Sequence, residues 1–163
     1  MELDPLDRKI LSILEADGRI SFADLAERVG LSKTPCWKRV KALEDAGIIR
    51  GYAARLDAGR LGFGVEAFVQ ASVDFELSDA FEEAVQKHPM ILRCHAMTGE
   101  ADYLLHVAAM DVVSLDQVLR KEISRLPGVR RTITSVSTRE IKGTVSVSDA
   151  LMHVQGASPR GRM

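Results

Sequence analysis

Apolar residues recur at helical spacing in the first stretch of the chain, between Asp4 and Gly18. Asp4 can cap a helix here, Pro5 suits its first position, and Gly18 can stop it. The inward stripe consists of Leu6, Ile10, Leu11, Ile13 and Leu14. The pattern therefore predicts a helix with one apolar face, which needs partners to cover it.

A second, shorter helix is predicted to begin at Phe22. Ser21 can cap the backbone N–H of Asp24, and the Asp24 carboxylate can reach back to complete a capping box. Gly30 supplies the left-handed residue that ends the helix. Only residues 30–32 then separate it from the next helix.

Ser32 can cap a third helix, with Pro35 confined to the first turn, where its missing N–H costs nothing. Cys36, Val40 and Leu43 share one apolar stripe. The opposite side carries Lys33, Thr34, Trp37, Lys38 and Lys41. A short, glycine-containing turn before a basic helix is typical of a helix-turn-helix, whose second helix enters the major groove of DNA.

The alternative is an ordinary helical hairpin, because a run of charges is usually a solvated face. Trp37 favours nucleic-acid binding, since a large ring among cations would be exposed unless it contacts a partner. The net charge of the chain is only −1, so attraction to phosphate must come from local placement of the cations.

A glycine-rich linker separates this region from a second one. Residues 48–56 are expected to form an extended wing or hinge strand, and Gly59, Gly62 and Gly64 follow within a few residues. Beyond them the period changes to two, which predicts a strand with one buried face. The inward positions are Val65, Ala67, Val69, Ala71, Val73 and Phe75.

The rest of the chain alternates further strands and helices. The pattern predicts a helix capped by Ser78 and ended by His88, a strand over 91–98, a turn over 99–102, a strand over 103–109, a helix ended by Pro127, and a last strand over 129–141. This βαββαβ order is that of the ferredoxin-like fold, with both helices on one face of a four-stranded antiparallel sheet. Phe68, His95 and His106 are expected on the open face, where a mixed surface suits a subunit interface.

Other classes of protein find little support. Cys36 and Cys94 are too few for a disulfide framework, and His95 with His106 lacks a third metal ligand at a convincing spacing, so neither a metal nor a cofactor is expected. No nucleophile is paired with a base and no glycine-rich phosphate loop is present, so we expect no enzyme and no catalytic residue. Without a signal peptide or a long apolar run, a cytoplasmic, nucleoid-associated protein with no membrane partner is expected.

Several of these motifs together resemble the Lrp/AsnC, or feast/famine, family of transcription regulators, over residues 2–142. The matching segments are Leu6–Leu11, Asp17–Ser21, Leu25–Ser32, Thr34–Cys36 with Arg39 and Val40, Gly47–Ile49, Thr98–Leu105 and Leu126–Val129. The resemblance implies an α+β protein with a winged helix-turn-helix domain (1–50), a hinge strand and linker (51–64), and an ACT-like RAM domain, for regulation of amino-acid metabolism (65–142). Residues 143–163 are expected to be a tail, with an extra edge strand over 144–147 and disorder over 158–162.

The resemblance also implies partners: double-stranded DNA, a second copy of the chain bound through the sheets, often four such dimers in an octamer, and a small effector, commonly an amino acid. Carried over to this chain, the DNA-binding residues are Ser32, Lys33, Thr34, Trp37, Lys38, Arg39 and Lys41. We expect Lys33, Thr34 and Trp37 near base edges and Lys38 and Lys41 near phosphates, whereas Arg39 fits either a phosphate contact or a structural ion pair.

The implied effector site comprises Gly99, Glu100, Asp102, Tyr103, Thr134, Ser135, Val136 and Ser137. Hydroxyl and backbone N–H groups suit a carboxylate, and Asp102 suits an ammonium group. The alternative for the turn at 99–102 is an ordinary hairpin turn, because Gly and Asp are common turn residues. A nucleoid-associated protein that compacts DNA and ignores small ligands is the alternative function.

Overall fold

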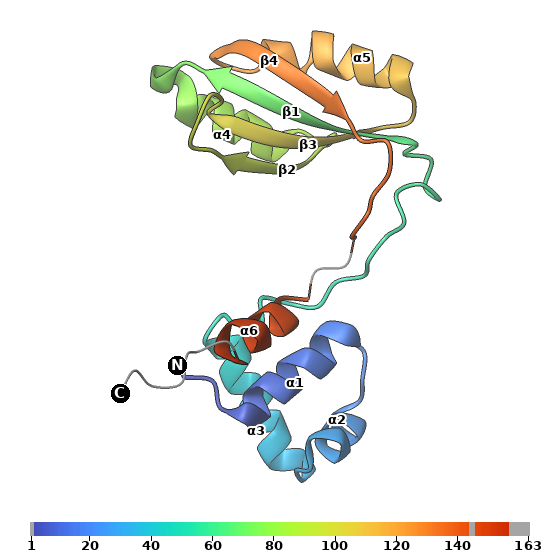
Figure 1. Ribbon diagram of the computed structural model, residues 1–163, viewed down its shortest axis with the longest axis vertical. Helices are drawn as coiled ribbons and strands as arrows, with labels where there is room; N and C mark the ends of the chain where they lie inside the picture. Colours follow the sequence, from blue (N-terminus) through green and yellow to red (C-terminus); the bar gives the residue numbers. More distant parts are fainter. Residues whose placement is uncertain (1, 144–145, 157–163) are drawn as a thin grey trace. The chain divides into compact units, whose positions relative to one another are not determined.

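The computed structural model describes residues 2–143 and 146–156 (Figure 1). The chain divides into two compact units, Met1–Arg55 with Lys142–Met163, and Leu56–Ile141. The first unit contains the helices α1 (Pro5–Ala16), α2 (Phe22–Val29), α3 (Lys33–Asp45) and α6 (Val147–Gly156). No described helix is both long and apolar enough to span a membrane.

The predicted caps of α1 and α2 are present. Asp4 accepts a hydrogen bond from the backbone N–H of Asp7 at 2.8 Å, and the Asp7 carboxylate accepts one from the N–H of Asp4, which completes a capping box. Ser21 caps α2 through the N–H of Asp24, although the Asp24 carboxylate meets the Ser21 hydroxyl and not its backbone. Gly30 ends α2 with a φ of 76°.

The cap expected of Ser32 is only half correct. Ser32 occupies the N-cap position of α3 with extended backbone, but its side chain makes no capping hydrogen bond. The predicted N-cap position of Ser32 is therefore confirmed, but the predicted capping hydrogen bond is absent. The hydroxyl is exposed and stays available to another acceptor.

The three helices α1, α2 and α3 share one small core. Its buried members are Ile10, Leu25, Ala26, Val29, Cys36, Val40 and Leu43. Cys36, Val40 and Leu43 are each at most 1% exposed, as the predicted stripe of α3 requires. Burying a large aliphatic side chain contributes about 1.5–3 kcal/mol, so this stripe fixes α3 on the other helices. The opposite face of α3 is thereby turned outward.

The expected wing or hinge strand is absent. Residues 46–64, all of them described, contain turns and irregular backbone but no strand. The backbone groups of this segment have no neighbouring strand with which to pair within the chain. An extended strand needs such a partner, because an unpaired strand has no source of backbone hydrogen bonds.

The second unit is a four-stranded antiparallel sheet with two helices. Its elements are β1 (Val65–Val73), a 3-10 turn η1 (Phe75–Leu77), α4 (Ser78–Lys87), β2 (Ile91–Ala96), β3 (Tyr103–Ala109), α5 (Val112–Lys121), a 3-10 turn η2 (Ile123–Arg125) and β4 (Val129–Val136). The strand order is β2-β3-β1-β4. The predicted βαββαβ order and fold class are confirmed, and Figure 1 shows α4 and α5 beside the sheet.

Both helices cover the same face of the sheet. Val69 of β1 lies opposite Leu105 of β3, and both are fully buried in a cluster that also holds Phe81 of α4 and Leu115 of α5. The neighbouring positions of the same strands point to the other face. Phe68 lies opposite His106 there and is 41% exposed.

Several predicted boundaries in this unit are wrong. Phe75 is 90% exposed, because β1 ends at Val73 and the chain turns into η1 before the alternation reaches it. Ser78 is the first residue of α4, not its cap, and its hydroxyl donates to the carbonyl of Phe75. The last strand ends at Val136, well before Ile141.

The C-terminal segment is a helix in place of the predicted edge strand. Residues 144–145 of that strand lie outside the described residues, but Val147 begins α6. The disorder predicted for 158–162 also lies outside the described residues. A local signal for this helix existed, because Ser146 and Asp149 have the spacing of a capping pair, and the Ser146 hydroxyl accepts from the Asp149 N–H at 3.0 Å.

Candidate DNA-binding surface and effector site

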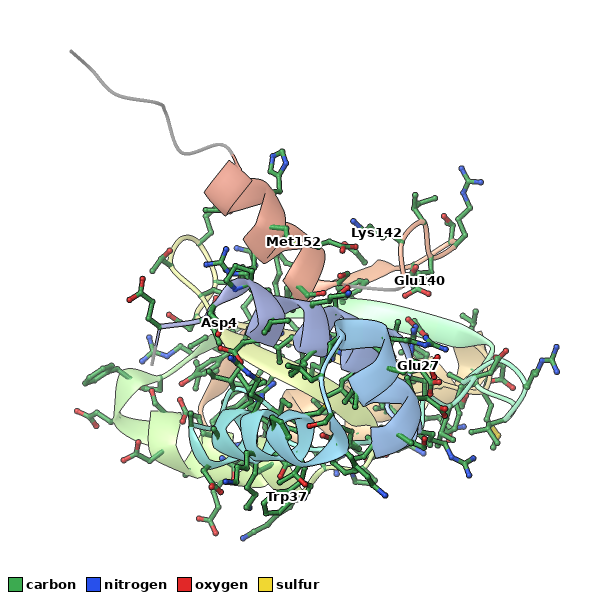
Figure 2. All side chains as sticks on the ribbon, turned by 90° about the horizontal axis from the view of Figure 1, so that it is seen from below. Asp4, Glu27, Trp37, Glu140, Lys142 and Met152 are labelled. Atoms are coloured by element: carbon green, nitrogen blue, oxygen red, sulfur yellow. The ribbon has the colours of Figure 1, made fainter. Side chains whose placement is uncertain are left out.

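The outward face of α3 carries exposed cations around an exposed tryptophan. Trp37 is 49% exposed, and Figure 2 shows its side chain on the outer side of α3. In the described part of the chain, Lys33 and Lys38 form no ion pair, so both ammonium groups are available to a partner. Ser32 and Thr34 are exposed beside them. The N-cap and the first two turns of α3 thus present hydroxyls, one ring and two ammonium groups without an ion pair in the described part of the chain.

Lys41 differs from Lys38 although both are exposed. Its ammonium group lies 3.0 Å from the carboxylate of Asp45 and 3.9 Å from that of Glu44. The hydrogen bond to Asp45 raises the pKa of Lys41 above its usual value. These two exposed carboxylates compete with a phosphate for the ammonium group, so we expect Lys41 to attract a phosphate less than Lys38 does.

Arg39 forms the structural ion pair that was one of its two predicted roles. Its Nη1 atom lies 2.6 Å from a carboxylate oxygen of Asp4 and 2.7 Å from one of Asp7. The capping hydrogen bond from the Asp7 N–H, followed by the one from Arg39, holds the pKa of Asp4 below its usual range. Asp7 is 6% exposed, and its charge is therefore paired inside the unit. Arg39 thus ties the middle of α3 to the start of α1.

The predicted effector turn is bonded tightly to the neighbouring strand. One oxygen of the Asp102 carboxylate accepts from the Val73 N–H at 2.8 Å, and the Asp102 N–H donates to the carbonyl of Ala71 at 3.1 Å. Gly99 has a φ of 134°, a conformation that favours glycine. Gly99, Glu100 and Asp102 are exposed. Asp102 therefore has a structural role that the sequence did not reveal.

Tyr103 points away from the exposed part of this turn. Its hydroxyl donates to Glu82 of α4 at 2.9 Å, and its ring lies 4.5 Å from that of Phe81. Burial, with the hydrogen bond to Glu82, raises the pKa of the Tyr103 hydroxyl. The side chain belongs to the core, so an effector at the surface of the turn would meet the backbone of Tyr103.

The predicted residues on β4 alternate between the two faces of the sheet. Thr134 and Val136 lie opposite Val69 and Ala67, on the face that the helices cover, whereas Ser135 lies opposite Phe68 on the open face. The N–H of Ser137 donates to the carbonyl of Glu66 at 2.8 Å. This part of β4 pairs with the first half of β1, while the turn at 99–102 bonds to its second half. One chain alone does not bring the predicted effector residues into a single site.

The open face of the sheet carries a polar and aromatic cluster. The rings of Phe68 and His106 are stacked with their centres 4.8 Å apart, and His106 Nε2 lies 2.9 Å from a carboxylate oxygen of Glu66. His95 is exposed on β2, opposite Leu104. Among the described residues, no group of three or more His, Cys, Asp or Glu side chains could hold a metal ion.

The two units together define a DNA-binding protein with a separate ligand-binding domain. Residues 3–50 match a family model for winged helix-turn-helix DNA binding, and residues 66–147 match the Lrp/AsnC ligand-binding domain. The chain therefore belongs to the Lrp/AsnC family of transcription regulators, as the sequence motifs predicted.

Individual relatives agree with this assignment. The leucine-responsive regulatory protein of Escherichia coli K12 is 42% identical over 144 residues, which cover 86% of this chain and 88% of that protein. A transcriptional regulator from Neisseria meningitidis, solved as a complex with L-Met, has a TM-score of 0.86 and 38% identity, and the match covers 90% and 96% of the two chains. An AsnC-family regulator from Agrobacterium tumefaciens has a TM-score of 0.84 and 35% identity, with 92% and 99% covered. All three relatives are named as regulators.

Proposed function

We propose that the protein regulates transcription by presenting paired copies of α3 to DNA, and that a small effector, an amino acid, controls this binding. The observation that carries the proposal is the presence, in one chain, of an outward basic α3 and a separate ligand-binding domain. A single α3 has few unpaired cations, so one copy would bind weakly. Two copies at a fixed spacing read two half-sites and gain affinity from avidity.

An aliphatic amino acid is the effector class that the relatives support. One relative is named for its response to leucine, and another was solved with L-Met. The other carboxylate oxygen of Asp102 could accept a hydrogen bond from an ammonium group, and Ser135 could donate one to a carboxylate. Because these residues do not converge in one chain, the proposed site is completed by residues of another copy.

The open face of the sheet is the surface that we propose for pairing with a second copy. It carries Phe68 and Ile133, which are 41% and 43% exposed, next to the stacked His106. Covering such apolar side chains removes them from water, which favours association. We further propose that four such dimers assemble into an octamer, and that the effector acts on this larger assembly.

Calorimetry with each of the twenty amino acids tests the effector. Leucine or methionine should release or absorb heat, and footprinting at fixed salt should show phased, protected sites that change when the same amino acid is added. Uniform protection with no binding of any amino acid would support the nucleoid-associated alternative. Asp102→Asn is the matched variant, since its amide oxygen can still accept from the Val73 N–H.

Sedimentation tests the pairing surface. The chain has a mass of 17.9 kDa, and we expect species at twice and at eight times this mass. Phe68→Asp should shift the distribution toward the monomer, because a buried, unpaired charge would oppose association. Phe75→Asp is the control, since Phe75 is 90% exposed and lies outside the sheet. Equal effects of the two variants would place the interface elsewhere.

A further inference from the structure

Helix α6 brings the end of the chain back to the DNA-binding unit. The chain leaves this unit after Arg55 and rejoins it at Lys142, so residues 56–141 are an insertion between two parts of one unit. The α6 helix packs on α1 (Figure 1). The match to the ligand-binding family model ends at residue 147, where α6 begins. The family match therefore assigns no role to this helix.

The carboxylate of Glu15, near the end of α1, holds the start of α6. Its two oxygens accept hydrogen bonds from the N–H groups of Val147 at 2.8 Å and Ser148 at 3.0 Å. The hydroxyls of Ser146 and Ser148 also donate to Glu15. The first N–H groups of a helix have no partner within it, and the helix dipole favours a negative charge there. Glu15 thus caps α6 from a different helix.

The burial of Ser148 and the charge of Glu15 both indicate a specific contact between α6 and α1. Ser148 is 9% exposed, whereas serine is mostly exposed in folded proteins. Burial raises the pKa of Glu15, but the hydrogen bonds from Ser148, Val147 and Ser146 outweigh it and leave the pKa below its ordinary 4.5. The folded unit therefore favours the ionised carboxylate.

Apolar side chains continue the contact beside Glu15. Leu151 of α6 and Leu11 and Leu14 of α1 line a groove of about 880 Å³. Residues 48–53 form another side of this groove, with Tyr52 among them. Leu151 is partly buried, whereas Met152 on the next position is 46% exposed and is labelled in Figure 2. One side of α6 therefore contacts α1 and the other faces water.

We propose that α6 docks onto α1 through the Glu15 carboxylate, and that this contact holds the segment after residue 142 on the DNA-binding unit. With only ten residues, α6 is too short to be stable by itself, since isolated helices below about 12–15 residues are marginal in water. It folds because it docks. The ligand-binding unit is consequently connected to the DNA-binding unit at both of its ends, by 51–64 on one side and by the segment before α6 on the other.

Hydrogen exchange on the full-length protein, read by NMR at neutral pH, tests this docking. The amides of 149–154 should exchange at least about 10-fold more slowly than in an unstructured peptide. Glu15→Ala should bring them within about 2-fold of the unstructured rate while the amides of α1 stay protected. Glu2→Ala is the matched control, because Glu2 is exposed and has no hydrogen bond or ion pair in the described part of the chain.

A second variant leaves α1 untouched. Val147→Pro removes the N–H that donates to the Glu15 carboxylate, while proline suits the first position of a helix. Protection of α6 should fall in this variant too, with unchanged protection of α1. Unprotected α6 amides in the unmodified protein, or protection that persists in both Glu15→Ala and Val147→Pro, would overturn the proposal. These outcomes do not depend on whether an amino acid binds, so they test docking separately from the proposed effector response.

Discussion

Arg39 of α3 donates a hydrogen bond to the buried carboxylate of Asp7 at 2.7 Å. Arg39→Ala should lower the melting temperature, because it leaves a buried carboxylate without its partner. The slope of log affinity for DNA against log salt should stay unchanged, whereas a phosphate contact would reduce it by about 0.9. Arg39→Lys should recover part of the stability, since it keeps the charge but not the planar guanidinium. A reduced slope with unchanged melting would instead assign Arg39 to DNA.

Lys38 and Lys41 lie on the same helix face but differ in their partners. Lys38→Ala should weaken binding to all DNA sequences alike and reduce the salt slope by about 0.9, as loss of one phosphate contact does. Lys41→Ala should reduce the slope less, because Asp45 already neutralises part of its charge at 3.0 Å. Fluorescence anisotropy at several salt concentrations measures both slopes. A larger effect of Lys41 would contradict this ranking.

Asp102 combines a structural hydrogen bond with the proposed effector contact. Asp102→Ala should destabilise the protein by about 1 kcal/mol, because the Val73 N–H loses its acceptor. Asp102→Asn keeps an acceptor and should restore most of this stability, yet still weaken amino-acid binding through loss of the charge. Thermal melting and calorimetry on the two variants separate the two roles. Full effector binding by Asp102→Asn would exclude the proposed ammonium contact.

Gly128 lies where no side chain fits. Its φ is 71°, and a Cβ atom would lie 2.8 Å from the Cβ of Leu77 and 3.1 Å from Cγ1 of Val73. Gly128→Ala should destabilise the ligand-binding unit by about 2–4 kcal/mol, from left-handed strain and overpacking together. Gly59→Ala, with only a 3.4 Å contact to the Asp57 side chain, should be nearly neutral. Urea denaturation compares the two variants.

Docking of α6 on α1 should weaken as the pH falls into the acid range. The pKa of Glu15 is lowered in the folded unit, so its carboxylate stabilises docking fully above its ordinary pKa of 4.5 and loses this effect as the pH falls through the lower folded value. Chemical shifts of 149–154 should therefore keep their helical values at neutral pH and lose them in acid. Glu15→Gln should abolish this transition, because an amide does not titrate in this range. A helix that persists unchanged in acid would count against the role of the carboxylate.

The helix-turn-helix could be predicted residue by residue because its determinants are local. The Ser21 cap, the left-handed Gly30 and the stripe of Cys36, Val40 and Leu43 each need only neighbours within a few positions. The open-face position of Phe68 was likewise predictable, because a strand alternates its faces. Local rules of this kind do not say which distant residue pairs with which.

The errors follow from that limit. The sequence left two roles open for Arg39, and only the fold brings its guanidinium within 2.7 Å of the distant Asp7 carboxylate. Phe75 continued the alternation of β1 but belongs to η1, because pairing with β4 ends at Val73. The strand predicted over 144–147 was wrong at Val147, which begins α6. The Ser146 and Asp149 capping pair was the local signal that was missed, and the contact with Glu15 lies more than a hundred positions away.

The return of the chain to the DNA-binding unit changes what a single proteolytic cut would do. A protease that cleaves once within the glycine-rich segment 51–64 would leave one fragment with α1, α2 and α3, and another with the sheet and α6. No peptide bond would then join the two fragments. The contact between α6 and α1 would then hold the two fragments together, and its affinity would decide whether the nicked protein separates.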